Sequence, residues 1–359
     1  MSAIAAVVEV DAAPEIGVRN SQPEGIGRLV ALDGLVCWNN LGRNVVFADP
    51  ALRPNAVFGT TLFPGEDEPS QYDLDVHAVL PLPELGLVVV LNHFGTVRGC
   101  PRAELVRAGA VRPVEPVIGW SFAADVERTV VAGGRLIGSR PRSEGAVGVL
   151  VSPPLAALGP GAVMPLDLEG TAFGEVTALA VVPSVAVPSI PGPMVVMGGD
   201  GRLALARLED DHLGAPRWEV EVGFRVAVIE WDDGILWAAG PSRGMVDDYD
   251  WERLGGGGFA VVDAGGEVMV DGNLPGDVAW GTGGVAVAVL GGSLVAAGRT
   301  GAIHAVDPRH PADDRTTAPL APASLGIGHL AVVGRRAVWG FNRGGYRLHA
   351  SGPPAPRTA

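Results

Sequence analysis

The sequence predicts an all-β fold, a seven-bladed β-propeller that forms a single domain over residues 1–350. Three observations predict it. Two short apolar runs joined by a turn recur seven times, a further apolar run precedes each pair, and the units repeat about every 45 to 55 residues, as propeller blades do. The 52 glycines and 30 prolines among the 359 residues supply the turns between many short strands.

The seven units follow one another along the chain. Their leading apolar runs begin near residues 28, 77, 122, 176, 225, 278 and 329. The paired runs that follow carry Gly, Asn or Arg at the turn, as in VCWNNLGRNVVFAD and VVMGGDGRLALARL, which is typical of β-hairpins. Three or four strands are therefore expected in each blade.

The two ends of the chain are expected to meet in the last blade. That unit ends near residue 350 and shows three strands, while the apolar run at residues 4–10 belongs to no unit. Pairing the two closes the ring and removes an exposed sheet edge. The Pro-rich segment 351–359 has no apolar core to bury and is predicted to be a disordered tail.

In this pattern of repeats the chain resembles the broad group of seven-bladed propellers that includes WD40 and YVTN-type proteins. The resemblance covers nearly the whole chain and concerns topology. The sequence has no recurring GH…WD signature and no catalytic motif of a known family. The resemblance therefore implies a fold, and the function has to be argued from individual residues.

Composition excludes several classes of partner. The net charge is -14, and the 26 basic residues are all arginine because the chain has no lysine. Nucleic acids and anionic membranes need a basic surface, so neither is expected as a partner. Without lysine, Schiff-base chemistry on a lysine is excluded. The two cysteines lack metal or redox spacing, and the N-terminus lacks a signal-like pattern, so a cytoplasmic location is expected.

The segment SQYDLDVH at residues 70–77 suggests a metal site. Side chains alternate along a strand, so Asp75 and His77 would share a face and could ligate a divalent ion. His93 or His329 could complete the ligand shell. Such an ion would support metal-assisted hydrolase or lactonase chemistry, and a divalent metal would then be the cofactor.

The same segment allows two other interpretations. His77 or His93 could act as a catalytic base oriented by a carboxylate from a neighbouring blade. Alternatively, the aspartates cap a turn and His77 packs inertly in the channel. No GxSxG or HExxH motif supports a serine hydrolase or a zincin.

The fifth unit carries an unusually long turn, PSRGMVDDYDWERLGGGG. Loops that outgrow their neighbours are often functional. We expect ligand or partner binding by this loop and by polar residues at the same end of other blades. These residues are Asn92, Asp247, Asp248, Tyr249, Asp250, Trp251, Arg299 and His329.

Two functions remain open from the sequence. The preferred one is a cytoplasmic binding or interaction module that takes a protein partner or a small molecule at the loop-bearing end of the ring. The alternative is an enzyme with its active site in the central funnel, built around Asp75, His77 and His93.

Overall fold

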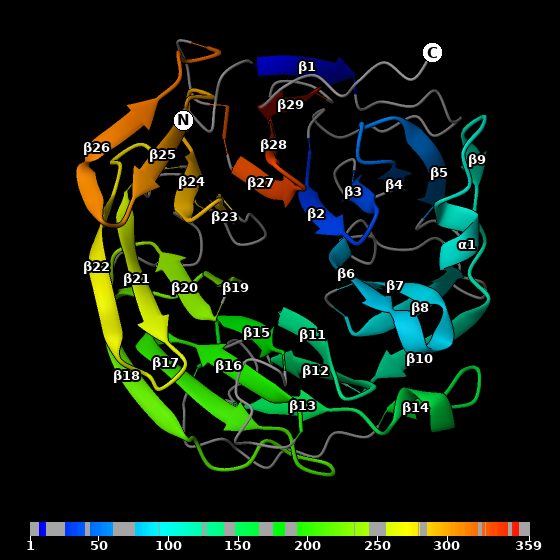
Figure 1. The fold of residues 1–359 in the computed structure, drawn as a ribbon. Coiled ribbons are helices and arrows are strands. Elements are labelled where there is room, and N and C mark those ends of the chain that lie inside the picture. Colours follow the sequence, from blue (N-terminus) through cyan, green and yellow to red (C-terminus); the bar gives the residue numbers. More distant parts are fainter. Residues whose placement is uncertain are drawn as a thin grey trace.

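Each apolar run of the repeat folds into a strand, and successive strands pair antiparallel into a sheet. The computed structural model arranges seven such sheets in a ring (Figure 1). It describes residues 7–11, 26–39, 44–59, 76–92, 94–123, 126, 128–139, 148–164, 175–183, 192–232, 234–243, 256–278, 280, 286–321, 325–326, 328–343 and 347–351.

Every blade begins with an inner strand at the central axis. These strands are β2 (Arg28–Leu32), β6 (Val76–Leu82), β11 (Arg128–Ala132), β15 (Ala178–Val182), β19 (Val228–Asp232), β23 (Val287–Leu290) and β27 (Gly328–Val333). Each of them lies beside the inner strands of the two neighbouring blades, so the seven form a closed ring.

The second and third strands lead outward from the axis. The second strands are β3 (Leu35–Asn39), β7 (Leu87–Asn92), β12 (Arg135–Ser139), β16 (Met194–Gly198), β20 (Ile235–Gly240), β24 (Ser293–Ala297) and β28 (Arg336–Phe341). The third strands are β4 (Asn44–Ala48), β8 (Thr96–Pro101), β13 (Val149–Val151), β17 (Asp200–Arg207), β21 (Gly257–Asp263), β25 (Ile303–Asp307) and β29 (Arg347–Ser351).

Most blades have a fourth strand at the rim. These are β5 (Pro54–Gly59), β10 (Ile118–Phe122), β18 (Trp218–Arg225), β22 (Val268–Leu274), β26 (His310–Thr316) and, in the last blade, β1 (Val7–Asp11). The described part of the third blade has three strands. The first and second blades each add a short fifth strand, β9 (Arg112–Pro113) and β14 (Val163–Met164), which pair parallel with β5 and β10.

Helices play a small part. The α-helix α1 (Arg102–Leu105) and two 3₁₀-helices, Pro83–Leu85 and Leu155–Ala157, lie between strands. In the described residues, no helix is long and apolar enough to cross a membrane.

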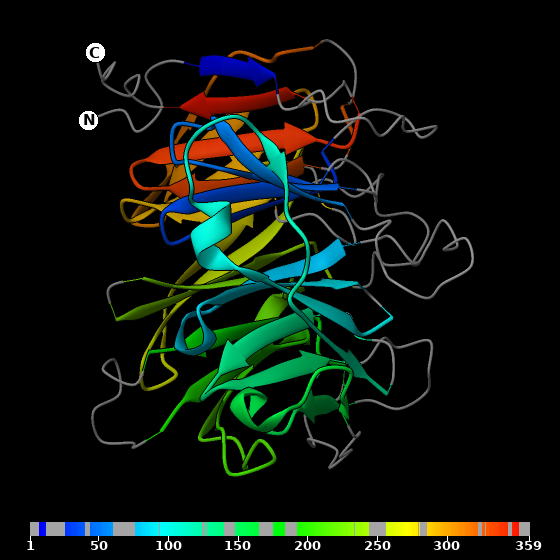
Figure 2. The ribbon, with the colours of Figure 1, turned by 90° about the vertical axis from the view of Figure 1, so that its right-hand side faces the viewer.

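The hydrophobic core lies between the blades. Within the described residues, each pair of neighbouring blades shares one cluster of buried apolar side chains. Between the fourth and fifth blades, for example, Val222 and Phe224 pack with Leu236 and Ala260. Stacked sheets seen from the side in Figure 2 thus bury both faces of every blade, which explains why the inner strands are nearly continuous apolar runs.

The N-terminal strand completes the last blade. β1 pairs antiparallel with β29, in a register that runs from Val7 opposite Ser351 to Asp11 opposite Arg347. β29 therefore has a partner on each side, and both ends of the described chain lie in one sheet (Figure 1).

Two inner strands begin later than the apolar runs predict. In the third blade β11 starts at Arg128, and Phe122 instead ends β10 of the second blade. In the sixth blade β23 starts at Val287, whereas Val278 makes an isolated bridge with Gly298. Phe122 and Val278 are both buried although they lie outside the inner strands. Their positions are therefore apolar for the same reason as those of inner-strand residues.

Candidate functional site at one end of the ring

One end of the ring gathers the segments that lead into the inner strands. Because the strands alternate in direction, each inner strand starts at the same end as the turn between the second and third strands of its blade. Backbone hydrogen bonds join the two kinds of segment: Arg299 N–H donates to Asp277 O at 2.8 Å, and Leu325 N–H donates to Arg299 O at 2.7 Å. We call the residues from the end of one blade's outermost strand to the start of the next blade's inner strand the lead-in segment of that next blade, and this end of the ring the lead-in face.

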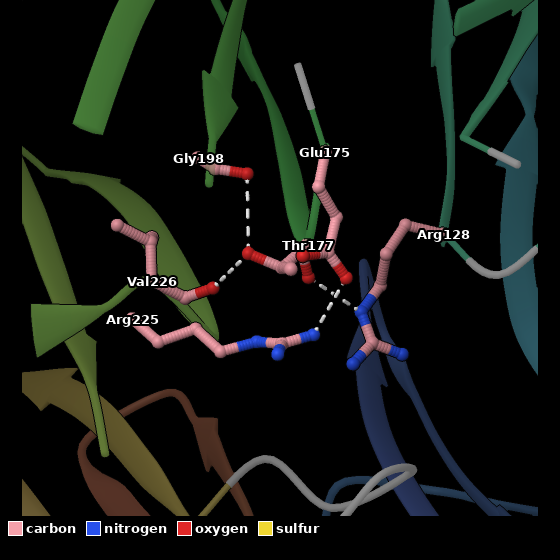
Figure 3. A network of polar contacts seen from close by, with 6 residues as sticks. All are labelled: Arg128, Glu175, Thr177, Gly198, Arg225 and Val226. Carbon is pink, nitrogen blue, oxygen red and sulfur yellow. Dashed lines mark hydrogen bonds and ion pairs between the residues drawn. The ribbon is translucent and has the colours of Figure 1, made fainter. Parts of the chain in front are cut away.

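A buried ion pair joins two lead-in segments of this face (Figure 3). Nη2 of Arg225, before the fifth blade, lies 2.8 Å from Oε1 of Glu175, before the fourth. The two side chains are 8% and 18% exposed, so water screens this pair less than it screens a surface pair. Removing a buried charge from its partner is costly, which fixes the positions of both segments.

Thr177 and Arg128 extend this network to a third blade. The Thr177 hydroxyl lies 3.2 Å from Gly198 O and 2.5 Å from Val226 O, and it has one proton to share between these carbonyls. Nε of Arg128, the first residue of β11, donates to Thr177 O at 2.9 Å. Side chains of the third, fourth and fifth blades thus form one connected network (Figure 3).

The turns at the lead-in face are also in contact with one another. The Arg243 guanidinium lies in the turn between β20 and β21 of the fifth blade. It donates at 3.1 Å to Asp200 O, at the corresponding turn of the fourth blade. A Cβ on Gly201 would lie 2.1 Å from the Arg243 Cζ, and Gly201 has a φ of +79°, so only glycine suits this position.

The sixth blade has its own polar contact at this face. Asp277 Oδ1 lies 2.7 Å from Nε2 of His304, and Nδ1 of the same ring lies 3.0 Å from the Thr316 hydroxyl. A Cβ on Gly298 would lie 2.4 Å from the other Asp277 oxygen, so a glycine is required beside this pair. The pair holds the lead-in segment of the sixth blade against its own sheet.

His77 is buried and faces the third blade. A register irregularity between Val76 and Ala78 lies at this residue, and Nε2 of His77 is 3.0 Å from the Thr129 hydroxyl on β11. Its proposed partners Asp75 and His93 lie outside the described residues. The metal site and the acid-base pair therefore stay predictions. In the part of the chain that the structure describes, no group of three or more His, Cys, Asp or Glu side chains is arranged to hold a metal ion.

His329 is buried near the start of the last inner strand. Burial, with a smaller effect of the Arg28 charge, lowers the pKa of His329 to about 3. Its imidazole is therefore neutral at physiological pH. Nδ1 is buried and makes no hydrogen bond to the described residues.

Asn92 ends β7 and Arg299 lies in the turn between β24 and β25, both at the lead-in face, and their role in binding stays a prediction. The Asn92 side chain accepts a hydrogen bond from Thr96 N–H at 2.8 Å and so closes the β7–β8 turn. Arg299 is bound through its backbone to the sixth and seventh lead-in segments. The predicted loop residues Asp247, Asp248, Tyr249, Asp250 and Trp251 lie outside the described residues.

The sequence has no motif at Arg128, Glu175, Thr177 or Arg225 that predicts a site. A signal for them exists, because Glu175 and Arg225 are 50 residues apart, and Thr177 is 49 residues from both Arg128 and Val226. These separations equal one blade repeat. Charged residues at equivalent offsets before predicted inner strands become neighbours once the blades stack into a ring.

A groove separates the outer strands of the fourth and fifth blades. Its volume is about 430 Å³, within the range of about 300 to 1,000 Å³ that is usual for ligand clefts. It is lined by Glu221, Val222, Gly223, Phe224, Ser242, Gly257, Gly258, Phe259, Ala260, Val268, Asp271, Gly272 and Asn273. Ser242 and Gly257 lie near the two ends of the long fifth-blade turn, whose residues 244–255 are not described.

Comparison with known proteins supports the architecture. No family model and no curated protein matches the sequence. Among solved structures, the WD40 domain of Neurospora crassa Pan2 is similar with a TM-score of 0.58 and 12% identity, over 92% of this chain and 90% of that chain. The chain is a seven-bladed β-propeller.

Two other solved structures show the same likeness. The WD40 β-propeller domain of Doa1 gives a TM-score of 0.54 at 13% identity, over 92% of this chain and 93% of that chain. The computationally designed Ika8 protein gives 0.53 at 12% identity, over 92% and 96%. At such low identities the likeness concerns the fold alone, and it confirms the resemblance to WD40-like propellers that the repeats indicated.

Proposed function

We propose that this propeller is an interaction module that binds a protein partner at its lead-in face, next to the long turn of the fifth blade. One observation carries the proposal. Arg225 is ion-paired to Glu175 in the fourth lead-in segment, and its backbone N–H donates to Pro241 O at 2.9 Å, at the start of the fifth-blade turn. The network in Figure 3 therefore continues to the root of that turn.

A preorganised surface favours binding. Buried ion pairs often contribute little more stability than apolar residues of similar size, so the main effect of this network is to fix the geometry of the fourth and fifth lead-in segments and the start of β11. A surface that is already rigid loses less conformational entropy on association. All seven blades place their lead-in segments, and the turns between their second and third strands, at one end of the ring. This end is a broad surface for a partner. The cytoplasmic location expected from the sequence remains part of this proposal.

Shortening the fifth-blade turn tests the proposal. Residues 245–254 would be replaced by a short glycine linker, and proteins that co-purify with the full chain would be compared between the two forms. We expect unchanged thermal unfolding and loss of the specific partner. A matched control, Asp210→Asn with Asp211→Asn, changes charge in an exposed turn at the opposite end of the ring and should keep the partner.

The result separates the two roles of the turn. If the shortened protein folds and retains its partner, binding does not involve this part of the lead-in face. If it does not fold, the turn is a structural element of the fifth blade.

A further inference from the structure

β18 is the rim strand of the fourth blade, and among the described residues nothing pairs with the middle of its outer edge. β17 pairs with one side of β18 over residues 218–225. On the other side, the described residues contribute a single bridge, between Phe224 and Ser242 at one end of the strand. An unpaired edge presents backbone N–H and C=O groups to any extended chain of suitable shape.

Contacts with the fifth blade hold both ends of this edge. At one end Phe224 bridges to Ser242. At the other end the Trp218 indole N–H donates to Ala264 O at 3.2 Å, in the β21–β22 turn. Between these contacts lie residues 219–223, of which residues 221–223 border the groove of about 430 Å³ described above. At about 3.3 Å per residue, this open edge is about 16 Å long and matches a peptide of about five residues.

The protein already covers two of its other rim edges with short added strands. β9 pairs parallel with β5, placing Arg112 beside Ala56 and Pro113 beside Val57. In the second blade Val163 lies beside Ser121 through the pairing of β14 with β10. Rim strands of this fold therefore accept a short parallel strand. In the described part of the chain, no segment does so at β18.

The opposite wall of the groove has an acidic group. Asp271 lies opposite Ala260, and Asn273 lies opposite Gly258, in the β21–β22 ladder. These residues face the fourth blade, because Ala260 packs with the fourth-blade cluster and a Cβ on Gly258 would lie 2.6 Å from the Phe224 ring. Asp271 is exposed and forms no ion pair with a described residue.

Charge and shape together define the occupant. Val222 and Phe224 of β18 pack toward the fifth blade, so the side chain of Glu221, which alternates with them, lies on the other face of the strand beside its cross-strand neighbour Arg202. The Asp271 carboxylate across the groove from an open strand edge favours an extended segment that carries a basic side chain. The exposed apolar side chains of Val268 and Met269 continue the wall along β22.

We propose that an extended segment of a partner protein adds to β18 as a fifth strand over residues 219–223 and places an arginine or lysine side chain against Asp271. This proposal rests on the proposed function and names the chemistry of the partner. The site lies on the side of the ring, beyond the lead-in face. Backbone pairing provides the affinity, and the acidic wall selects basic sequences.

A blocked pentapeptide tests the proposal on the full chain. The probe is acetyl-Val-Arg-Val-Arg-Val-amide, with acetyl-Val-Glu-Val-Glu-Val-amide and a backbone N-methylated form of the first as controls. Binding is measured by calorimetry and by hydrogen exchange of backbone amides. We expect the arginine peptide alone to bind, with slower exchange confined to residues 219–223 and to the facing part of β22.

Variants separate the groove from general charge. Asp271→Asn should weaken binding about five- to tenfold, as expected for loss of one charged contact. Glu267→Gln makes the same change of charge at an exposed residue of the same strand region that does not line the groove, and it should change affinity less than about twofold. Asn273→Trp fills the groove and should abolish binding, and Asp271→Asn serves as the test if that variant does not fold.

Three results would overturn the proposal: no protection of residues 219–223 by the arginine peptide, equal binding of the N-methylated peptide, or equal effects of Asp271→Asn and Glu267→Gln. Loss of the natural partner on shortening residues 245–254, with no peptide binding at β18, would refute the groove and leave the proposed function standing. If the arginine peptide binds at β18 but the shortened protein keeps its natural partner, the groove stands and the proposed function is refuted.

Discussion

The Glu230 carboxylate connects the inner strands of the fifth and sixth blades, accepting a hydrogen bond from the backbone N–H of Val289 at 2.8 Å. Val228, Trp237 and Val287 surround this contact. Burial raises the pKa of Glu230 to about 7, the Val289 N–H opposes the shift, and the Asp232 charge adds to it. A carboxylic acid between two blades is thus partly protonated near neutral pH.

This pKa predicts a pH-dependent contribution to stability. Between about pH 4.5 and pH 7 the folded protein keeps a proton that the unfolded chain has released, so the contribution of Glu230 falls as the pH rises. Glu230→Gln keeps an acceptor for the Val289 N–H and removes the charge. At pH 8 we expect the variant to be more stable than wild type by about 1 to 3 kcal/mol, and at pH 4 to be equal to it.

Urea unfolding at several pH values measures this difference. His329 acts in the opposite direction: its pKa is lowered, so stability falls as the pH drops from about 6.5 to about 3. Because both proteins contain His329, its effect cancels when the variant is compared with wild type. A free-energy difference that is the same at pH 4 and pH 8 would refute the assignment of Glu230.

Thr177 should be sensitive to loss of its hydroxyl. Thr177→Val keeps the shape of the side chain but leaves the carbonyls of Gly198 and Val226 without this donor. We expect a loss of about 1 to 3 kcal/mol in the free energy of unfolding, whereas Thr177→Ser should lose less than half as much. Chemical denaturation measures both, and equal losses would assign the effect to the methyl group.

The Arg225–Glu175 pair should show strong coupling. Arg225→Met leaves the Glu175 carboxylate without this partner, and Glu175→Leu leaves a buried guanidinium, so we expect each to cost about 3 kcal/mol. The double variant should cost less than the sum by about 1 to 3 kcal/mol. A double-mutant cycle from denaturation curves provides the coupling energy, and strict additivity would show that the two side chains act independently.

Gly198 should tolerate no side chain. A Cβ there would lie 2.4 Å from Val226 Cγ1 and 2.7 Å from Val226 Cβ, so Gly198→Ala forces the fifth lead-in segment to move. We expect a cost of about 1 to 3 kcal/mol, measured by thermal unfolding. Gly223→Ala is the matched control, since a Cβ there meets nothing within 4 Å, and its stability should equal or exceed that of wild type. Similar losses in both variants would contradict the packing argument.

The blade pattern could be predicted from the sequence because each hairpin is local: its apolar runs and its turn lie within about twenty residues of one another. Cys37 and Cys100, the two cysteines without metal or redox spacing, are buried thiols whose pKa burial raises to about 12. Asn92 and Arg299 lie in the predicted turns.

Other features depend on how the blades meet in space. The pair of Arg225 and Glu175 requires two blades to be stacked before either residue has a partner. β9 and β14 are two residues long, and Pro113 in β9 weakens any strand signal, so the sequence offers no period for them. The groove beside β18 arises from the curvature of two neighbouring sheets, which no single segment encodes.

The pairing of β1 with β29 also governs the order in which the protein can be completed. Val7 is synthesised long before Ser351, so β1 has no strand to pair with until β29 has been made. Until then the other blades can stack only as an open arc, with an apolar face uncovered at each end. Closure of the ring is therefore a long-range step that leaves apolar surface exposed until it forms, and chaperones that shield sheet edges would act at that stage.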